Sequence, residues 1–144
     1  MDERTQDALV LTERIRATPD EVFDFLVEPD KLLRWIGTDA DIDPQPGGKF
    51  WLNVTGDDIA IGSYLEVDRP NRVVFTWGWD GSLEVPPGSS TVTFTLTADG
   101  DETVVELAHA GLPMGQDDEH RNGWVYFLGR LVDTVSGHEL NQQR

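Results

Sequence analysis

The chain has 144 residues, of which 38% are hydrophobic and 26% charged, and these values predict one globular domain with a substantial core. Its 27 acidic residues against 11 basic ones give a formal net charge of −16, so nucleic acid and anionic membrane surfaces are not expected partners. No apolar run is long enough to span a bilayer. The chain has no cysteine, which excludes disulfides, zinc–thiolate sites and cysteine nucleophiles. Because Met1–Asp7 also lacks the features of a secretory signal, a cytoplasmic location is expected.

The N-terminal part predicts a strand followed by two short helices. Alternating and β-branched residues over Leu9–Arg16 indicate the strand. Thr18 is a typical N-cap and Pro19 is favoured at the first helical position, so a helix is expected to begin there. After an interruption, a second short helix is predicted over Lys31–Ile36, with Gly37 ending it.

The middle of the chain changes to an apolar period of two, which is typical of strands. Mostly short, Gly- and Pro-rich turns separate the segments, so successive strands are expected to pair in antiparallel fashion. The predicted strands are Asp39–Asp43, Lys49–Thr55, Ile59–Val67, Arg72–Trp79, Ser90–Ala98 and Thr103–His109.

The C-terminal part predicts one long amphipathic helix. Asp117 or Asp118 can cap its start. An apolar stripe at helical spacing follows, made of Trp124, Phe127, Leu128, Leu131, Val132 and Val135. The whole pattern predicts an α+β domain whose sheet is closed by this helix, with a pocket between sheet and helix.

Several motifs occur in a fixed order along this pattern. They are Ala17-x-Pro19-x-x-Val22-Phe23, Leu33-x-Trp35-Ile36-Gly37, Pro46-Gly47-Gly48-x-Phe50, Gly62-x-x-x-Glu66-Val67-x-x-Pro70-x-Arg72-Val73-Val74-Phe75-Thr76-Trp77, Thr103-x-Val105-x-Leu107-x-His109-x-Gly111-Leu112 and Gly123-Trp124-x-x-x-Leu128-x-x-Leu131. Together they resemble the family named after the C-terminal domain of activators of the heat-shock-protein-90 ATPase, within the START-like, or SRPBCC, superfamily. The resemblance covers about Leu9 to Leu131.

This resemblance implies a helix-grip fold, in which a curved antiparallel sheet of about seven strands wraps around a long C-terminal helix, with two short helices after the first strand. It implies a single domain over residues 1–144 with a core of about 9–137. Relatives bind lipids, sterols or polyketides in an apolar cavity, and some cyclise polyketides. Phe23 and Ile36 stand where Trp and Phe are more usual in the family, which leaves the size of the ligand open.

Alternation along the strands gathers aromatic side chains and one imidazole on the face expected to meet the helix. His109 could orient a ligand carbonyl or hydroxyl or act in acid–base chemistry, or it could be a hydrogen-bonded histidine at a strand end. The apolar residues could line a cavity, or they could fill a solid core. The predicted ligand-binding set is Trp35, Phe50, Phe75, Trp77, Phe94, Leu107, His109, Trp124 and Leu128.

Two acidic segments imitate metal sites without satisfying their requirements. Consecutive residues of a helix point in different directions, so Asp117–His120 cannot converge on one ion and is interpreted as an acidic helix start. Asp39-x-Asp41-x-Asp43 lacks the later Gly and Glu of a calcium loop, since Pro44 and Phe50 stand there. The sequence therefore predicts no metal, no cofactor and no catalytic residue.

Three functions remain open from the sequence. The leading hypothesis is the binding of a small hydrophobic or amphipathic molecule in the cavity. The second is a co-chaperone-like interaction module with a chaperone as partner, acting through the acidic outer surface. The third is a cyclase- or hydrolase-like enzyme that needs a carboxylate beside His109. Monomer and homodimer are both compatible with the sequence.

Overall fold

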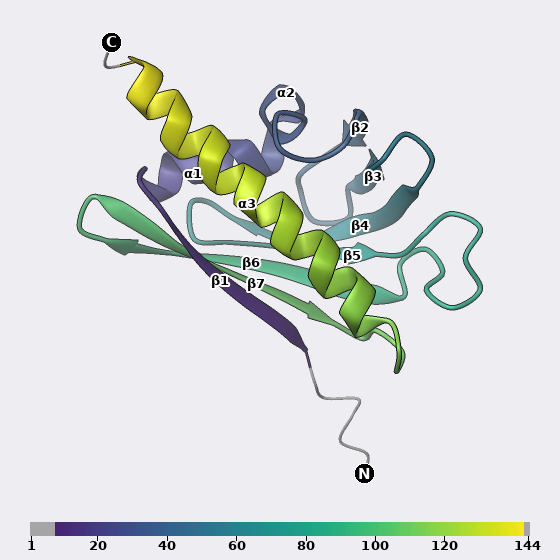
Figure 1. Ribbon diagram of the computed structural model, residues 1–144. Coiled ribbons are helices and arrows are strands. Elements are labelled where there is room, and N and C mark those ends of the chain that lie inside the picture. The colour runs from purple at the N-terminus through teal and green to yellow at the C-terminus, as the bar shows by residue number, and fades with distance from the viewer. Residues whose placement is uncertain (1–7, 143–144) are drawn as a thin grey trace.

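The computed structural model describes residues 8–142, and side chains to Ser136. Residues 1–7, on which the absence of a secretory signal was argued, lie outside the described part. The elements in chain order are β1 (Leu9–Ile15), α1 (Pro19–Val27), α2 (Pro29–Leu32), β2 (Asp39–Ile42), β3 (Lys49–Asn53), β4 (Ile59–Asp68), β5 (Arg72–Trp77), β6 (Ser90–Asp99), β7 (Glu102–Ala110) and α3 (Asp117–Gln142) (Figure 1).

Within residues 8–142, seven strands form one sheet in the order β1-β7-β6-β5-β4-β3-β2, and every neighbouring pair is antiparallel. The first strand pairs with the last, so that Leu9 lies opposite His109. Figure 1 shows α3 crossing one face of the curved sheet, with α1 and α2 beside its C-terminal half. The predicted α+β fold with a helix-gripping antiparallel sheet is confirmed.

The start of α1 follows the sequence prediction. Thr18 accepts a hydrogen bond from the backbone N–H of Glu21 at 3.2 Å, and the Glu21 carboxylate accepts one from the N–H of Thr18 at 3.2 Å. This capping box satisfies backbone donors that the first helical turn leaves free.

The second helix lies earlier than predicted, at Pro29–Leu32 instead of Lys31–Ile36. Pro29 suits a first helical turn because it has no N–H to leave unsatisfied. Glu28 is extended, with φ −99° and ψ 123°, and it serves both as C-cap of α1 and N-cap of α2. The interruption expected at this point is therefore one residue long.

Most other strand boundaries differ from the prediction by one or two residues, and two boundary differences bear on the site. Strand β5 ends at Trp77 instead of Trp79, because the chain at Gly78 passes so close to the next loop that a Cβ there would lie 1.8 Å from Pro86 O. Helix α3 already includes Asp117, so Gln116 is the residue before its first turn, and neither Asp117 nor Asp118 is the cap.

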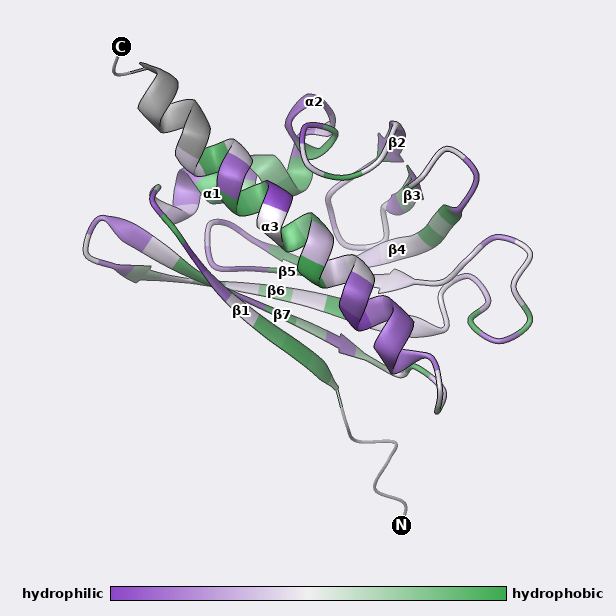
Figure 2. Ribbon diagram, in the orientation of Figure 1, coloured by the Kyte–Doolittle hydropathy of each residue, from purple (hydrophilic) through white to green (hydrophobic). Residues whose placement is uncertain are grey.

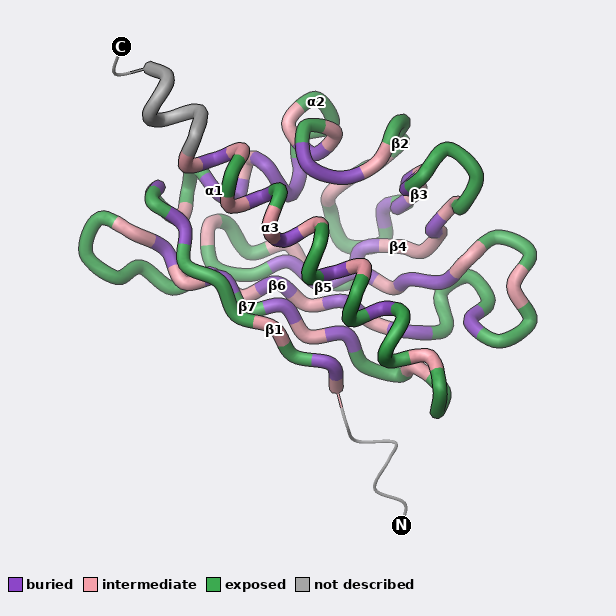
Figure 3. The backbone as a smooth tube through the Cα atoms, in the orientation of Figure 1, coloured by how far each residue is buried: buried purple, intermediate pink, exposed green. Residues whose placement is uncertain are grey.

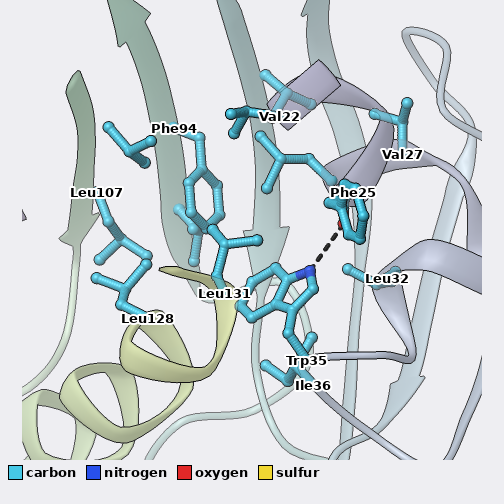
Figure 4. Packing of buried hydrophobic residues seen from close by; sticks show 14 of the residues in the cluster. Val22, Phe25, Val27, Leu32, Trp35, Ile36, Phe94, Leu107, Leu128 and Leu131 are labelled. Atoms are coloured by element: carbon cyan, nitrogen blue, oxygen red, sulfur yellow. Dashed lines mark hydrogen bonds between the residues drawn. The ribbon is translucent and has the colours of Figure 1, made fainter. Parts of the chain in front are cut away.

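The inward face of the sheet and one side of α3 form the core, and Figure 3 shows buried residues concentrated there. Figure 2 shows that the first turns of α3 are hydrophilic and that apolar residues begin further along the helix. Trp35 packs edge-on against Phe94, with ring centroids 6.3 Å apart, and its Nε1–H donates to Phe25 O at 2.8 Å (Figure 4). Within residues 8–142, no helix is long and apolar enough to cross a membrane.

Candidate functional site

A cavity of about 320 Å³ opens beside the N-terminal turns of α3. Its walls come from α3, from the end of β5 and the residues after it, from the turn between β3 and β4, and from the segment after α2. The lining residues are Ile36, Val54, Asp58, Trp77, Trp79, Gln116, Glu119, His120, Gly123, Trp124 and Phe127. This volume lies at the lower end of the range for small-molecule sites, ~300–1,000 Å³.

Three indole rings make the apolar wall. Trp77 is at the centre, with its ring centroid 5.2 Å from that of Trp79 and 5.3 Å from that of Trp124. The Trp77 and Trp79 rings stand at 83° to each other, and the Trp77 and Trp124 rings at 48°. The cavity is therefore bounded by ring faces that meet at steep angles.

Behind this wall, His109 takes part in a directed chain of hydrogen bonds. Trp124 Nε1–H donates to His109 Nδ1 at 3.0 Å. Ser90 Oγ donates to Trp77 O at 2.7 Å, so its contact of 2.9 Å with His109 Nε2 requires that the nitrogen carries the hydrogen. His109 is therefore the neutral Nε2–H tautomer.

The surroundings of His109 also favour the neutral form. The side chain is 1% exposed, and burial, with a smaller contribution from nearby His120, lowers the pKa of His109 to about 3. Within residues 8–136, the bonds of its two ring nitrogens go to Trp124 and Ser90 and none goes to a carboxylate. The acid–base pair that an enzyme using His109 requires is not formed by these residues.

His120 is a second buried histidine, and it lines the cavity itself. Trp79 Nε1–H donates to His120 Nε2 at 2.9 Å, so His120 Nδ1 carries the hydrogen and donates to Gln116 O at 2.7 Å. The rings of His109 and His120 stand at 90°, with centroids 5.4 Å apart. Two indole–imidazole hydrogen bonds thus connect α3 to the sheet and to the segment after β5.

The structure brings all nine residues of the predicted ligand-binding set into the protein interior. Only two of the nine, Trp77 and Trp124, line the 320 Å³ cavity. A second, nearly filled space of about 10 Å³ lies deeper between sheet and helix. It is bordered by Trp77 and Trp124 again, together with Trp35, Phe50, Phe75 and Phe94. Leu107, His109 and Leu128 border neither space.

The predicted ligand-binding set lacks several lining residues, most notably His120, Trp79 and Phe127. Strand alternation and helical spacing placed Trp79 and Phe127 on inward faces, so only His120 was missed altogether. His120 was interpreted only as part of an acidic helix start. It precedes Trp124 by four residues, which places it one turn earlier on the same face of α3, and this spacing was an available signal. Among the residues described, no group of three or more His, Asp or Glu side chains is placed to hold a metal ion.

The fold and site define a START-like protein, in which an antiparallel sheet grips one long helix beside a small aromatic cavity. The family model described as "Activator of Hsp90 ATPase homolog 1-like protein" matches residues 16–136. The chain belongs to this family.

Individual relatives agree with this assignment. An "activator of 90 kDa heat shock protein ATPase homolog" of Dictyostelium discoideum is 29% identical over 137 residues, which are 92% of this chain. The chain spans about a third (34%) of the length of that protein.

Solved structures show the same fold. An AHSA1-like protein of Rhizobium etli is 40% identical, with a TM-score of 0.71 over 95% of this chain and 88% of that one. A protein of Plasmodium falciparum described as an HSP90 activator is 25% identical, with a TM-score of 0.74 over 90% of this chain and 96% of that one.

Proposed function

We propose that the protein binds a small hydrophobic or amphipathic molecule in the 320 Å³ cavity. The observation that carries this proposal is the cavity itself, which has apolar and aromatic walls and a few polar groups at its edge. Sites for small molecules have this composition. The affinity comes mainly from removing apolar ligand surface from water, worth ~25 cal/mol per Å² before the costs of association.

The role of the histidines changes relative to the sequence hypothesis. In the leading sequence hypothesis His109 orients a ligand, but its nitrogens are occupied by Trp124 and Ser90, which agrees with the alternative of a hydrogen-bonded histidine at a strand end. His120 is occupied in the same way by Trp79 and Gln116. In this proposal both histidines hold the indole rings in place, and the rings contact the ligand.

The proposal can be tested by titrating the protein with 1-naphthalenemethanol, an uncharged aromatic probe, and recording ¹⁵N–¹H spectra. The chain has five tryptophans, whose indole N–H signals report separately. We expect the signals of Trp77, Trp79 and Trp124 to move on binding. The signals of Trp35 and Trp51, which do not line the cavity, should stay in place. Equal movement of all five would indicate nonspecific association and would contradict the proposal.

Two glycines of α3 offer a matched pair of variants. A Cβ added at Gly123 or at Gly129 meets nothing within 4 Å, but only Gly123 lines the cavity. Gly123→Leu should therefore fill the site and weaken probe binding, whereas Gly129→Leu should leave it unchanged. Both variants replace glycine by a better helix former, so loss of folding does not explain a difference between them.

A co-chaperone-like role is a second candidate, and family membership together with the Dictyostelium and Plasmodium relatives favours it. The outer side of α3 exposes Val125 and Tyr126, and the formal charge of −16 favours a partner surface that is basic. The test is whether the protein raises the ATPase rate of a heat-shock-protein-90 chaperone. Binding to the chaperone should weaken as salt is added. If α3 contacts the chaperone, Tyr126→Ala should reduce this binding.

A further inference from the structure

The cavity presents hydrogen-bond acceptors and aromatic faces, and most of its hydrogen-bond donors are already used. We infer that the molecule it binds is an organic cation, with an apolar or aromatic body and an ammonium head. This inference rests on the proposed function and names the class of ligand.

Most donors of the cavity wall are engaged within the protein. The indole N–H groups of Trp79 and Trp124 donate to His120 and His109. The side-chain amide of Gln116 donates one of its two hydrogens to Glu84 Oε1 at 3.0 Å. The indole nitrogen of Trp77 is fully buried without a hydrogen-bond partner among the described residues, so it is not exposed to a molecule in the cavity.

The two carboxylates of the cavity, in contrast, keep acceptor oxygens available to a ligand. Asp58 and Glu119 line the cavity and are exposed. Asp58 Oδ2 accepts a hydrogen bond from Thr55 Oγ1 at 2.9 Å. Within residues 8–136, no hydrogen bond reaches Asp58 Oδ1 or the Glu119 carboxylate. In the same part of the chain, no Lys or Arg side chain lines the cavity, so a ligand carboxylate or phosphate would find repulsion instead of a counter-charge.

The N-terminus of α3 does not make the electrostatic potential at the mouth of the cavity positive. The N-terminus of a helix carries a partial positive charge that attracts anions. Here the first turn contains Asp117, Asp118 and Glu119, whose negative charges already occupy that end of the helix dipole. The net potential at the mouth of the cavity is therefore negative.

The aromatic walls favour a cation independently of the carboxylates. Trp offers the strongest cation–π interaction of the protein side chains, and cages of aromatic rings are a known way to bind ammonium groups. The three indoles of the cavity meet at 83° and 48°, and Phe127 adds a further ring. A cationic head bound in this cavity would meet these ring faces as well as the carboxylates of Asp58 and Glu119.

The test uses three probes of matched shape: 1-naphthylmethylammonium, 1-naphthalenemethanol and 1-naphthoate. Dissociation constants are measured by titration calorimetry at neutral pH, with the movement of the Trp77, Trp79 and Trp124 indole signals as a check on the site. We expect the ammonium compound to bind roughly tenfold more tightly than the alcohol, and the carboxylate to bind most weakly.

A pair of double variants separates the cavity carboxylates from the overall negative charge. Asp58→Asn with Glu119→Gln should remove most of the preference for the ammonium compound over the alcohol. Asp68→Asn with Glu106→Gln removes the same two charges from exposed positions on the sheet and should preserve the preference.

The possible failures are distinguishable. If the ammonium compound binds no more tightly than the alcohol, the inference is overturned while the proposed function stands. An equal loss of preference in both double variants overturns it as well, because the selectivity would then come from the overall charge. If none of the three compounds moves the cavity indole signals, the proposed function fails together with the inference.

Discussion

Trp124 on α3 donates its indole hydrogen to the unprotonated Nδ1 of His109 on β7, across 3.0 Å. The bond joins the long helix to the strand that pairs with β1, the first strand of the chain. It exists only while His109 is neutral, because a protonated Nδ1 would be a donor facing another donor. The attachment of the helix to the sheet is therefore coupled to the charge of one buried imidazole.

This coupling predicts a loss of stability in mild acid. The pKa of His109 is lowered from about 6.5 to about 3 by burial and by nearby His120. Between these values the unfolded chain binds a proton that the folded chain does not, so the stabilisation is complete above pH 6.5 and decreases as the pH falls towards 3. The slope is ~1.4 kcal/mol per pH unit within that window.

The measurement is urea unfolding between pH 7 and pH 4.5 for the wild type and for His109→Gln, which keeps a donor and an acceptor but does not titrate. Acid titration of the many carboxylates affects both proteins alike. The difference in free energy of unfolding between the two should shrink as the pH falls. A difference that stays constant with pH would show that His109 is not held neutral.

A second prediction compares two tryptophans that differ in how their indole nitrogen is satisfied. Trp35 Nε1 donates to Phe25 O, whereas Trp77 Nε1 is buried without a partner in the part of the chain that the structure describes. Trp35→Phe leaves a buried carbonyl unpaired, and Trp77→Phe removes an unsatisfied donor. Both substitutions lose similar ring volume, so Trp35→Phe should be the more destabilising by about 1–2 kcal/mol. Thermal and urea unfolding of the two variants test this, and the opposite ranking would contradict it.

The elements of this fold could be predicted because local signals agree with the tertiary structure. Thr18 and Glu21 define the start of α1 through contacts three residues apart. Period-two alternation gave the strands, since each has one face against the core. The end of β5 could not be predicted, because it depends on how close Gly78 comes to Pro86, a contact between different segments.

The cavity was harder to predict from the sequence, because it too depends on contacts between different segments. Alternation identified Trp77 as inward-facing, but it does not tell whether an inward side chain meets protein atoms or empty space. That depends on packing across the whole interior, which leaves about 10 Å³ on the inner side of Trp124 and about 320 Å³ beside the start of α3. The partner of His109 likewise required the register that places Val92 opposite it and Ser90 two residues away.

The third prediction concerns the glycines of α3. Gly123 and Gly129 lie inside a helix, where glycine costs ~1 kcal/mol relative to alanine. Apart from the helix backbone and the chain neighbours, a Cβ at either position would meet no atom of residues 8–136 within 4 Å. Gly123→Ala and Gly129→Ala should each raise the free energy of unfolding by about 0.5–1 kcal/mol. A control is Gly62→Ala on β4, where a Cβ would lie 1.9 Å from Thr76 O, and this variant should be strongly destabilised. Destabilisation by Gly129→Ala would show that the surface of α3 is covered at that position.

The last prediction concerns the acidic surface. With a formal charge of −16, repulsion among carboxylates opposes the compact state. Ion pairs such as Lys49–Asp41, whose side chains are 62% and 63% exposed, add little to the stability of the fold. Screening these pairs by salt therefore costs little stability. Raising NaCl from about 10 mM to about 150 mM shortens the screening length from ~30 to ~8 Å, so repulsion falls more than attraction does. The melting temperature should therefore rise, by about 4 °C for each 1 kcal/mol of repulsion relieved.

Scanning calorimetry with NaCl and with KCl tests this, because screening depends on ionic strength and not on which cation is present. A melting temperature that does not change with salt would mean that the charges are too dispersed to strain the fold.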